Sequence, residues 1–187
     1  MTPSFEQQLS EISTVLAALR AQAATVDAIA ALVRDTVLGG GTLYTAGNGG
    51  SSTDAQHLAE ELIGRYRSNR RALPAVSLTA DSSVLTCIAN DFGYEAIFSR
   101  QIEGLMRPGD VLVAFSTSGN SPNIVAALEA ARARGGNTIA LLGKTGGACQ
   151  GLADLELIVA SNNTARIQEA HLQVLHYICE VVEAALE

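Results

Sequence analysis

The chain has 187 residues, 48% of them hydrophobic, and a formal net charge of −7, which favours one globular domain over a disordered or fibrous chain. Its acidic balance repels phosphate backbones, so general nucleic-acid binding is excluded as a main function and any anionic ligand must be held locally. No apolar run approaches the ~18 residues that span a bilayer, and Met1 to Ser10 lacks the basic start and apolar centre of a signal peptide, so we expect a cytoplasmic protein without a membrane partner.

The chain begins and ends with predicted helices. Ser4 to Leu38 shows apolar residues at three- and four-residue spacing and ends at three glycines, and Thr164 to Leu186 forms a second long helical segment. These Ala-rich helices exceed what a five-stranded sheet needs for cover, so we expect them to pair between subunits of a homo-oligomer. Packing on their own sheet alone is the alternative.

Between these helices, apolar runs of strand length alternate with helix-like stretches. The predicted strands are Thr42 to Ala46, Leu73 to Leu78, Val111 to Phe115, Thr138 to Leu142 and Leu155 to Ala160. The runs lack polar alternation, as expected for parallel strands covered by helices on both faces. The sequence therefore predicts an α/β fold with a doubly wound five-stranded parallel sheet. Residues 1–187 form one domain, in which 1–38 is the helical oligomerisation segment and 39–187 the α/β core with the C-terminal helix.

The first candidate ligand loop is GNGGSS, Gly47 to Ser52, between the first predicted strand and a predicted helix over Thr53 to Gly64. Its glycines let the backbone approach a ligand, Ser51 supplies a hydroxyl, and the start of the helix attracts an anion. A tight turn with a serine cap is the alternative. Ser52 stands where a dinucleotide fingerprint needs its third glycine, so no NAD site is predicted.

The second candidate loop is STSGNS, which follows the Val111 to Phe115 strand and precedes a helix expected to open at Pro122. Four hydroxyls in this loop can bind phosphate oxygens; they belong to Ser116, Thr117, Ser118 and Ser121. A plain serine-rich loop is the alternative. Two such loops after separate strands of one open sheet predict the crevice in which these folds bind ligands.

Two other segments resemble ligand-binding sequences but are interpreted as structural. RYRSNRR, Arg65 to Arg71, is interpreted as a solvated connecting segment rather than as an anion site. GKT, Gly143 to Thr145, resembles the end of a P-loop, but Thr138 stands where that motif needs its first glycine. We interpret it as a turn, with Lys144 as a candidate anion contact.

All three histidines of the chain fall in two predicted helices. His57 and Glu61 have an i, i+4 spacing, which places both side chains on one face about 6 Å apart and suits either a shared metal or an exposed helix pair. Gln168, His171 and His176 share the last helix, where His171 also fits a surface or interface residue. Gln168 and His176 are about 12 Å apart along the helix axis, so they share one ion only by reaching toward each other or from neighbouring subunits. The three cysteines lack C-x-x-C spacing and predict neither a disulfide framework nor a cysteine zinc site.

These motifs are part of four longer segments: GNGGSSTDAQHLAEELIGR, SVLTCIANDFGYEAIFSRQ, GDVLVAFSTSGNSPNIVAAL and TARIQEAHLQVLH. Together they resemble the bacterial phosphoheptose isomerases of the sugar isomerase (SIS) fold, and the similarity runs through nearly the whole chain. The serine loops are common to SIS domains, which bind sugar phosphates. The combination of QH-x-x-x-E with RIQE and the late histidine is narrower and is similar to the heptose enzyme.

The resemblance implies an aldose-ketose isomerase that interconverts sedoheptulose 7-phosphate and D-glycero-D-manno-heptose 7-phosphate, the first step of heptose synthesis for lipopolysaccharide and other surface polysaccharide. It implies a homotetramer whose sites are lined by more than one subunit. It implies one Zn²⁺ per subunit, held by His57, Glu61, Gln168 and His176. The proton-transferring pair of the expected enediolate chemistry is Glu61 and His176. The implied substrate contacts are Asn48, Gly49, Gly50, Ser51, Glu61, Asn90, Asp91, Ser116, Thr117, Ser118, Ser121 and Gln168.

Two other functions stay open at this point. The first is a non-catalytic SIS protein that binds a phosphosugar or a replication-initiator protein and regulates. Such a module has no need for four metal ligands together, and for that reason we favour the enzyme. The second is an isomerase of another sugar phosphate, which shares the phosphate anchor but differs in the length of its substrate.

Overall fold

The five predicted apolar runs form a five-stranded, all-parallel sheet with the strand order β2-β1-β3-β4-β5 in the computed structural model, which describes residues 4–186. The strands are β1 Leu43–Gly47, β2 Ala75–Ser77, β3 Val111–Ser116, β4 Asn137–Gly143 and β5 Leu155–Val159. β1 and β3 are buried along their whole length, as expected for strands with helices on both faces. The predictions for residues 1–3 and 187 lie outside the described residues.

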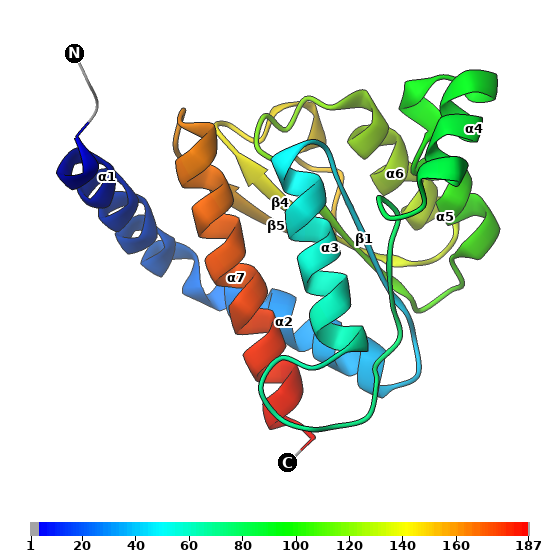
Figure 1. Cartoon of the computed structure of the whole chain (residues 1–187), viewed down its shortest axis with the longest axis horizontal. Coiled ribbons are helices and arrows are strands. Elements are labelled where there is room, and N and C mark those ends of the chain that lie inside the picture. Colours follow the sequence, from blue (N-terminus) through cyan, green and yellow to red (C-terminus); the bar gives the residue numbers. More distant parts are fainter. Residues whose placement is uncertain (1–3, 187) are drawn as a thin grey trace.

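Helices cover both faces of this sheet, which confirms the doubly wound prediction (Figure 1). The helices outside the first 22 residues are α2 Ala23–Leu38, α3 Gly50–Ile63, α4 Ser82–Phe92, α5 Ser99–Leu105, α6 Pro122–Ala133 and α7 Thr164–Ala184. α2, α3 and α7 pack on the face that carries Val113, whereas α4, α5 and α6 pack on the face that carries Leu112. Because successive strand residues point to opposite faces, both cores draw on the same strand.

The order of the strands reverses between β1 and β3, which lie side by side in the sheet. Gly47, the last residue of β1, pairs in register with Phe115 near the end of β3. The two loops predicted to bind a ligand therefore leave the sheet next to each other, at the topological switch point where open α/β sheets bind their ligands.

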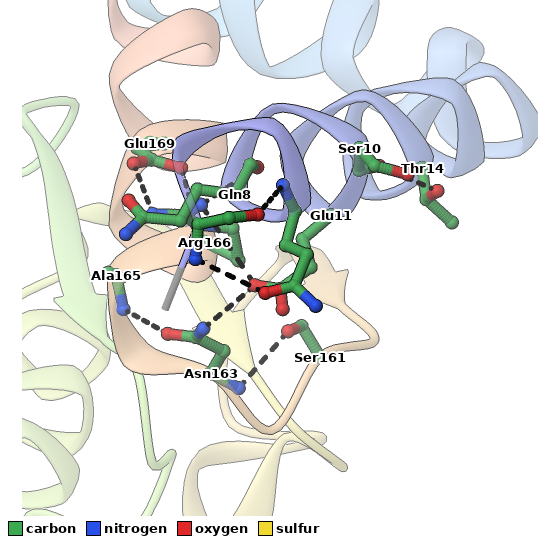
Figure 2. Close-up of polar contacts among 11 residues, drawn as sticks. Gln8, Ser10, Glu11, Thr14, Ser161, Asn163, Ala165, Arg166 and Glu169 are labelled. Atoms are coloured by element: carbon green, nitrogen blue, oxygen red, sulfur yellow. Dashed lines mark hydrogen bonds and ion pairs between the residues drawn. The ribbon is translucent and has the colours of Figure 1, made fainter. Parts of the chain in front are cut away.

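The N-terminal helical segment, predicted as one helix, is divided into α1 Phe5–Ala18, a 3₁₀ turn η1 Leu19–Gln22, and α2. α1 projects from the body of the molecule, and none of its residues is buried (Figure 1). Its link to α7 is partly apolar, through Val15 and Leu16, and partly polar: buried Arg166 donates from Nη1 to the carbonyl oxygen of Gln8 at 2.9 Å (Figure 2). Asn163, which caps α7, also donates to Glu11 at 3.3 Å.

The N-terminal helical segment is more apolar than its uninterrupted apolar runs indicate. By length and composition, Phe5–Leu38 contains an 18-residue window apolar enough to cross a membrane, and only 11% of that window is buried. A helix that packs against another protein surface has the same length and composition, since a membrane helix and an interface helix both need an apolar exterior.

Candidate active site

The first loop turns sharply from β1 into α3. Gly49 has a φ of 56°, a left-handed conformation that favours glycine, and α3 begins at Gly50, three residues earlier than predicted. Ser51 lies in the first helical turn and is only 3% exposed. A Cβ atom on Gly50 would overlap the side-chain amide of Gln168 on α7. The glycine at position 50 therefore lets the α3 backbone approach Gln168, a residue of the protein, rather than a ligand.

The second loop brings its hydroxyls together at the end of β3. Ser116 is 3% exposed, accepts a hydrogen bond from the backbone N–H of Gly119 at 3.1 Å, and lies 3.4 Å from the hydroxyl of Ser121. Gly119 has a φ of 66°, and a Cβ atom there would overlap the backbone of Gly146. Thr117 and Ser118 are half-buried, and α6 opens at Pro122 as predicted.

A hydrogen-bonded amide pair joins the two loops. The side-chain amides of Asn48, directly after β1, and Asn123, in the first turn of α6, exchange two hydrogen bonds of 2.8 Å each. The hydroxyl of Tyr94 donates to Asn48 Oδ1 at 3.0 Å. Sequence reasoning missed Asn123 and Tyr94; the position of Asn123 two residues after a ligand-loop serine was the only available indication.

Three candidate metal ligands converge between α3 and α7. His57 Nε2 lies 3.1 Å from Glu61 Oε1, as the i, i+4 spacing predicts, and the ring of His176 packs edge-on at 5.1 Å from that of His57. One ligand atom from each of the three residues lies within 4.8 Å of the others. The His57 and Glu61 side chains are 33% and 16% exposed. The third donor from α7 distinguishes this group from an ordinary exposed helix pair.

The remaining polar residues of α7 have other neighbours. Gln168 lies against Gly50, about 12 Å of helix axis from His176. His171 is fully buried and donates from Nε2 to the carbonyl oxygen of Leu142 at 3.1 Å. Burial lowers the pKa of His171 to about 4. The interpretation of His171 as a surface residue is therefore wrong within this chain.

Asn90 and Asp91 lie at the exposed end of α4. Asn90 donates to Asp91 at 2.7 Å, and Asp91 accepts a long hydrogen bond from Cys87 at 3.8 Å. Both side chains thus bond within their own helix. Their predicted contact with substrate stays a prediction.

Comparison with known proteins places this chain in a family. Residues 7–143 match the family model of the SIS domain. A phosphoheptose isomerase from Geobacter sulfurreducens is 49% identical over 100% of this chain and 99% of its own length, and one from Citrifermentans bemidjiense is 48% identical over 100% and 97%. The chain belongs to the SIS-domain phosphoheptose isomerase family.

Solved structures of phosphoheptose isomerases share the whole fold with this family member. The enzyme from Francisella tularensis aligns with a TM-score of 0.89 and 32% identity, over 98% of this chain and 100% of its own. The enzyme from Neisseria gonorrhoeae aligns with a TM-score of 0.85 and 36% identity, over 97% and 100%. The resemblance seen in the four sequence segments is confirmed, and this chain is a sugar-phosphate isomerase by family.

The cluster of His57, Glu61 and His176 fits a divalent metal ion. Two imidazole nitrogens and one carboxylate oxygen are a common donor set for Zn²⁺, and they leave coordination positions open for a further ligand. The aromatic ring of Tyr66 lies 5.7 Å from the ring of His176, so the cluster is bordered by apolar surface on that side.

The segment Arg65 to Arg71, interpreted from the sequence as solvated, is anchored by a buried ion pair. The side chain of Arg70 is 7% exposed, donates to the carbonyl oxygens of Glu61 and Leu62 at 2.6 and 2.7 Å, and lies 3.5 Å from the carboxylate of Glu183 on α7. The interpretation is therefore wrong for Arg70. Because the same segment carries the tyrosine beside His176, its anchoring bears on the geometry of the metal cluster.

Proposed function

We propose that this protein interconverts sedoheptulose 7-phosphate and D-glycero-D-manno-heptose 7-phosphate in the cytoplasm, as the first step of heptose synthesis for surface polysaccharide. The proposal is carried by the convergence of His57, Glu61 and His176 in a chain 48% identical over its whole length to a phosphoheptose isomerase. A protein that only binds a phosphosugar or a replication-initiator protein has no need of such a cluster.

The two loops at the switch point are proposed to hold the phosphate of the substrate. Residues 48–51 and 116–121 present backbone and hydroxyl groups at the starts of α3 and α6, where helix dipoles favour an anion. Holding the phosphate end of the substrate limits the positions that its reacting carbons can take. Gln168, beside the first loop, and the exposed Asn90 and Asp91 complete the proposed substrate contacts.

Glu61 and His176 are proposed to transfer the protons. Moving hydrogen between C1 and C2 of the sugar passes through an enediolate, which requires a base and an acid within reach of adjacent atoms. The two side chains come from different helices and meet in one cluster. One of them can therefore act as the base and the other as the acid. Zn²⁺ held by His57, Glu61 and His176 would supply an electrophile for the developing charge. Because Gln168 lies against Gly50, about 12 Å of helix axis from His176, the fourth proposed ligand would be the Gln168 of a neighbouring subunit.

We propose that the protein assembles as a homotetramer through its N-terminal helices. On α1, Phe5 and Leu9 are 74% and 43% exposed. An apolar groove of about 400 Å³ runs between the N-terminal helices and α7, with Leu16, Leu19 and Tyr177 in its walls. Sedimentation should show a tetramer for the wild type and smaller species for a Phe5→Ser, Leu9→Ser double variant, whereas an unchanged tetramer would place the interface elsewhere.

The deciding experiment measures turnover of three sugar phosphates by metal-stripped protein and by the same protein restored with zinc. We expect zinc-restored conversion of sedoheptulose 7-phosphate, and none of fructose 6-phosphate or ribulose 5-phosphate. Glu61→Gln should abolish turnover, while Glu60→Gln, the same change on the exposed neighbour, should not. Conversion of another sugar would redefine the substrate, and folded, zinc-loaded protein without any turnover would favour the binding module.

A further inference from the structure

We propose that Asn123 is a positioning residue of the substrate site, which together with the hydroxyl of Tyr94 fixes the side chain of Asn48 for contact with an oxygen of the sugar phosphate. The inference rests on the proposed function and adds two residues to it. Its physical basis is the hydrogen-bond capacity of one amide.

The partners of Asn48 occupy most of that capacity. Asn48 Oδ1 accepts one hydrogen bond from Asn123 Nδ2 at 2.8 Å and a second from the hydroxyl of Tyr94 at 3.0 Å, which uses both of its lone pairs. Asn48 Nδ2 donates one of its two N–H groups to Asn123 Oδ1 at 2.8 Å. One N–H group is left. In this orientation Asn48 meets a ligand as a hydrogen-bond donor, and its partner is an acceptor oxygen.

The side chain of Asn48 is held in place by contacts from two elements. Asn123 is 2% exposed, so its side chain is held by the core around the start of α6. Tyr94 lies in the 3₁₀ turn η2 Tyr94–Ala96 after α4 and is 62% exposed. An amide pair alone keeps its two hydrogen bonds when both side chains flip. In the orientation that the structure shows, the hydroxyl of Tyr94 donates to Asn48 Oδ1 and adds a third hydrogen bond to the pair.

The fixed amide borders a cavity at the switch point. This cavity has a volume of about 250 Å³, and its walls include Asn48, Gly49, Tyr94 and Phe98. Asn48 follows β1 and Asn123 follows the second ligand loop, so their pair also ties the two loops to each other. A change in Asn123 should therefore reach a ligand through Asn48.

A double-mutant cycle separates this positioning role from a general structural one. The variants are Asn123→Ala, Asn48→Ala and their combination, and the readouts are the affinity for sedoheptulose 7-phosphate by titration calorimetry and the steady-state kcat and KM. Loss of neutral hydrogen bonds should weaken affinity about 5- to 10-fold in Asn123→Ala. We expect KM to rise more than kcat falls, and the double variant to bind no more weakly than Asn48→Ala alone.

Tyr94→Phe gives the same test without opening the core, because Tyr94 is exposed. It should weaken binding about 2- to 5-fold in the wild-type background and have no effect in Asn48→Ala. Tyr44→Phe is the matched control, since that hydroxyl donates to the carbonyl oxygen of Leu105 instead, and should leave the affinity unchanged.

Multiplicative losses in the double variants, or unchanged affinity in both Asn123→Ala and Tyr94→Phe, would overturn the proposal. A wild-type protein that binds the sugar phosphate without turning it over would refute the proposed function alone, because the binding cycle would still decide the role of Asn123. A wild-type protein that binds no sugar phosphate would overturn both.

Discussion

Replacing Glu183 by glutamine should destabilise the protein by about 3 kcal/mol, because this carboxylate anchors a loop through buried hydrogen bonds. Glu183 is 5% exposed and accepts from the backbone N–H groups of Tyr66, Arg67 and Ser68, each at 3.0 Å. Arg70 adds its charge at 3.5 Å. Burial opposes ionisation, but the three N–H groups and this guanidinium hold the pKa of Glu183 below its usual value.

The magnitude follows from what glutamine cannot do at this position. Its amide NH₂ replaces one acceptor oxygen and faces a backbone donor, which leaves at least one buried N–H without a partner at a cost of about 1–3 kcal/mol. The charge of Arg70 also loses its partner, and breaking a buried pair from one side costs about 3–5 kcal/mol in total. Glu183→Gln keeps one acceptor oxygen, so the lower end of that range applies.

Chemical and thermal denaturation at matched protein concentration measure the effect. A loss of 3 kcal/mol corresponds to a fall in Tm of about 6–12 °C for a chain of this size. Since the pKa of Glu183 is depressed by folding, its contribution is present above the pKa of the unfolded state and is lost as the pH falls. Glu180→Gln, one turn earlier on α7 and 43% exposed, is the control and should cost at most about 0.5 kcal/mol. Equal costs for the two variants would refute the reasoning.

Three further predictions concern α3 and α7. Folding depresses the pKa of His171 to about 4, so between pH 6.5 and 4 the wild type should lose about 3 kcal/mol that His171→Gln does not lose; parallel stability curves would contradict this. Burial raises the pKa of Asp54 to about 6, so the wild type loses stability as the pH rises through that value. Asp54→Asn should therefore stabilise metal-stripped protein by about 1 kcal/mol at pH 7.5, a figure reduced for solvent screening, and should have no such effect at pH 4. Gly50→Ala must displace the amide of Gln168, so it should weaken sugar-phosphate binding with little loss of Tm. Gly104→Ala meets no atom and lies in α5, so it should leave binding unchanged and should not lower the Tm, since alanine favours a helix over glycine.

The fold could be predicted where hydrophobic pattern and pairing coincide. Val111 to Phe115 is apolar because both faces of a central strand are covered, and the structure extends that strand by only one residue. At the edge of the sheet the pattern overstates the strand. Leu73 and Leu78 are buried, yet the strand is only Ala75–Ser77. The backbone N–H of Leu73 donates to Leu62 of α3 instead of to the sheet, and Leu78 keeps one backbone hydrogen bond to Thr45 of β1.

The site could be predicted only as far as local spacing reaches. The i, i+4 spacing brings His57 to Glu61 through helix geometry alone. The approach of His176 depends on how α7 packs on α3, and the sequence indicated it only through family resemblance. Arg70 shows the opposite failure, since an arginine in a charged run is usually solvated and its buried carboxylate partner lies 113 residues away.

The packing of α3 on α7 also explains how an acidic chain can hold a sugar phosphate in a defined position. At the start of α3, Gly50 lies beside Gln168 and the ligand loops; two turns further, His57 lies beside His176. The two levels are about 10 Å apart along α3. In the proposed arrangement, backbone groups and hydroxyls rather than bulk positive charge would hold the phosphate at the first level, and the far end of a long sugar would then reach the second. We therefore expect a shorter sugar phosphate anchored in the same loops to fall short of Glu61 and His176, so that the separation along one helix contributes to selection for chain length.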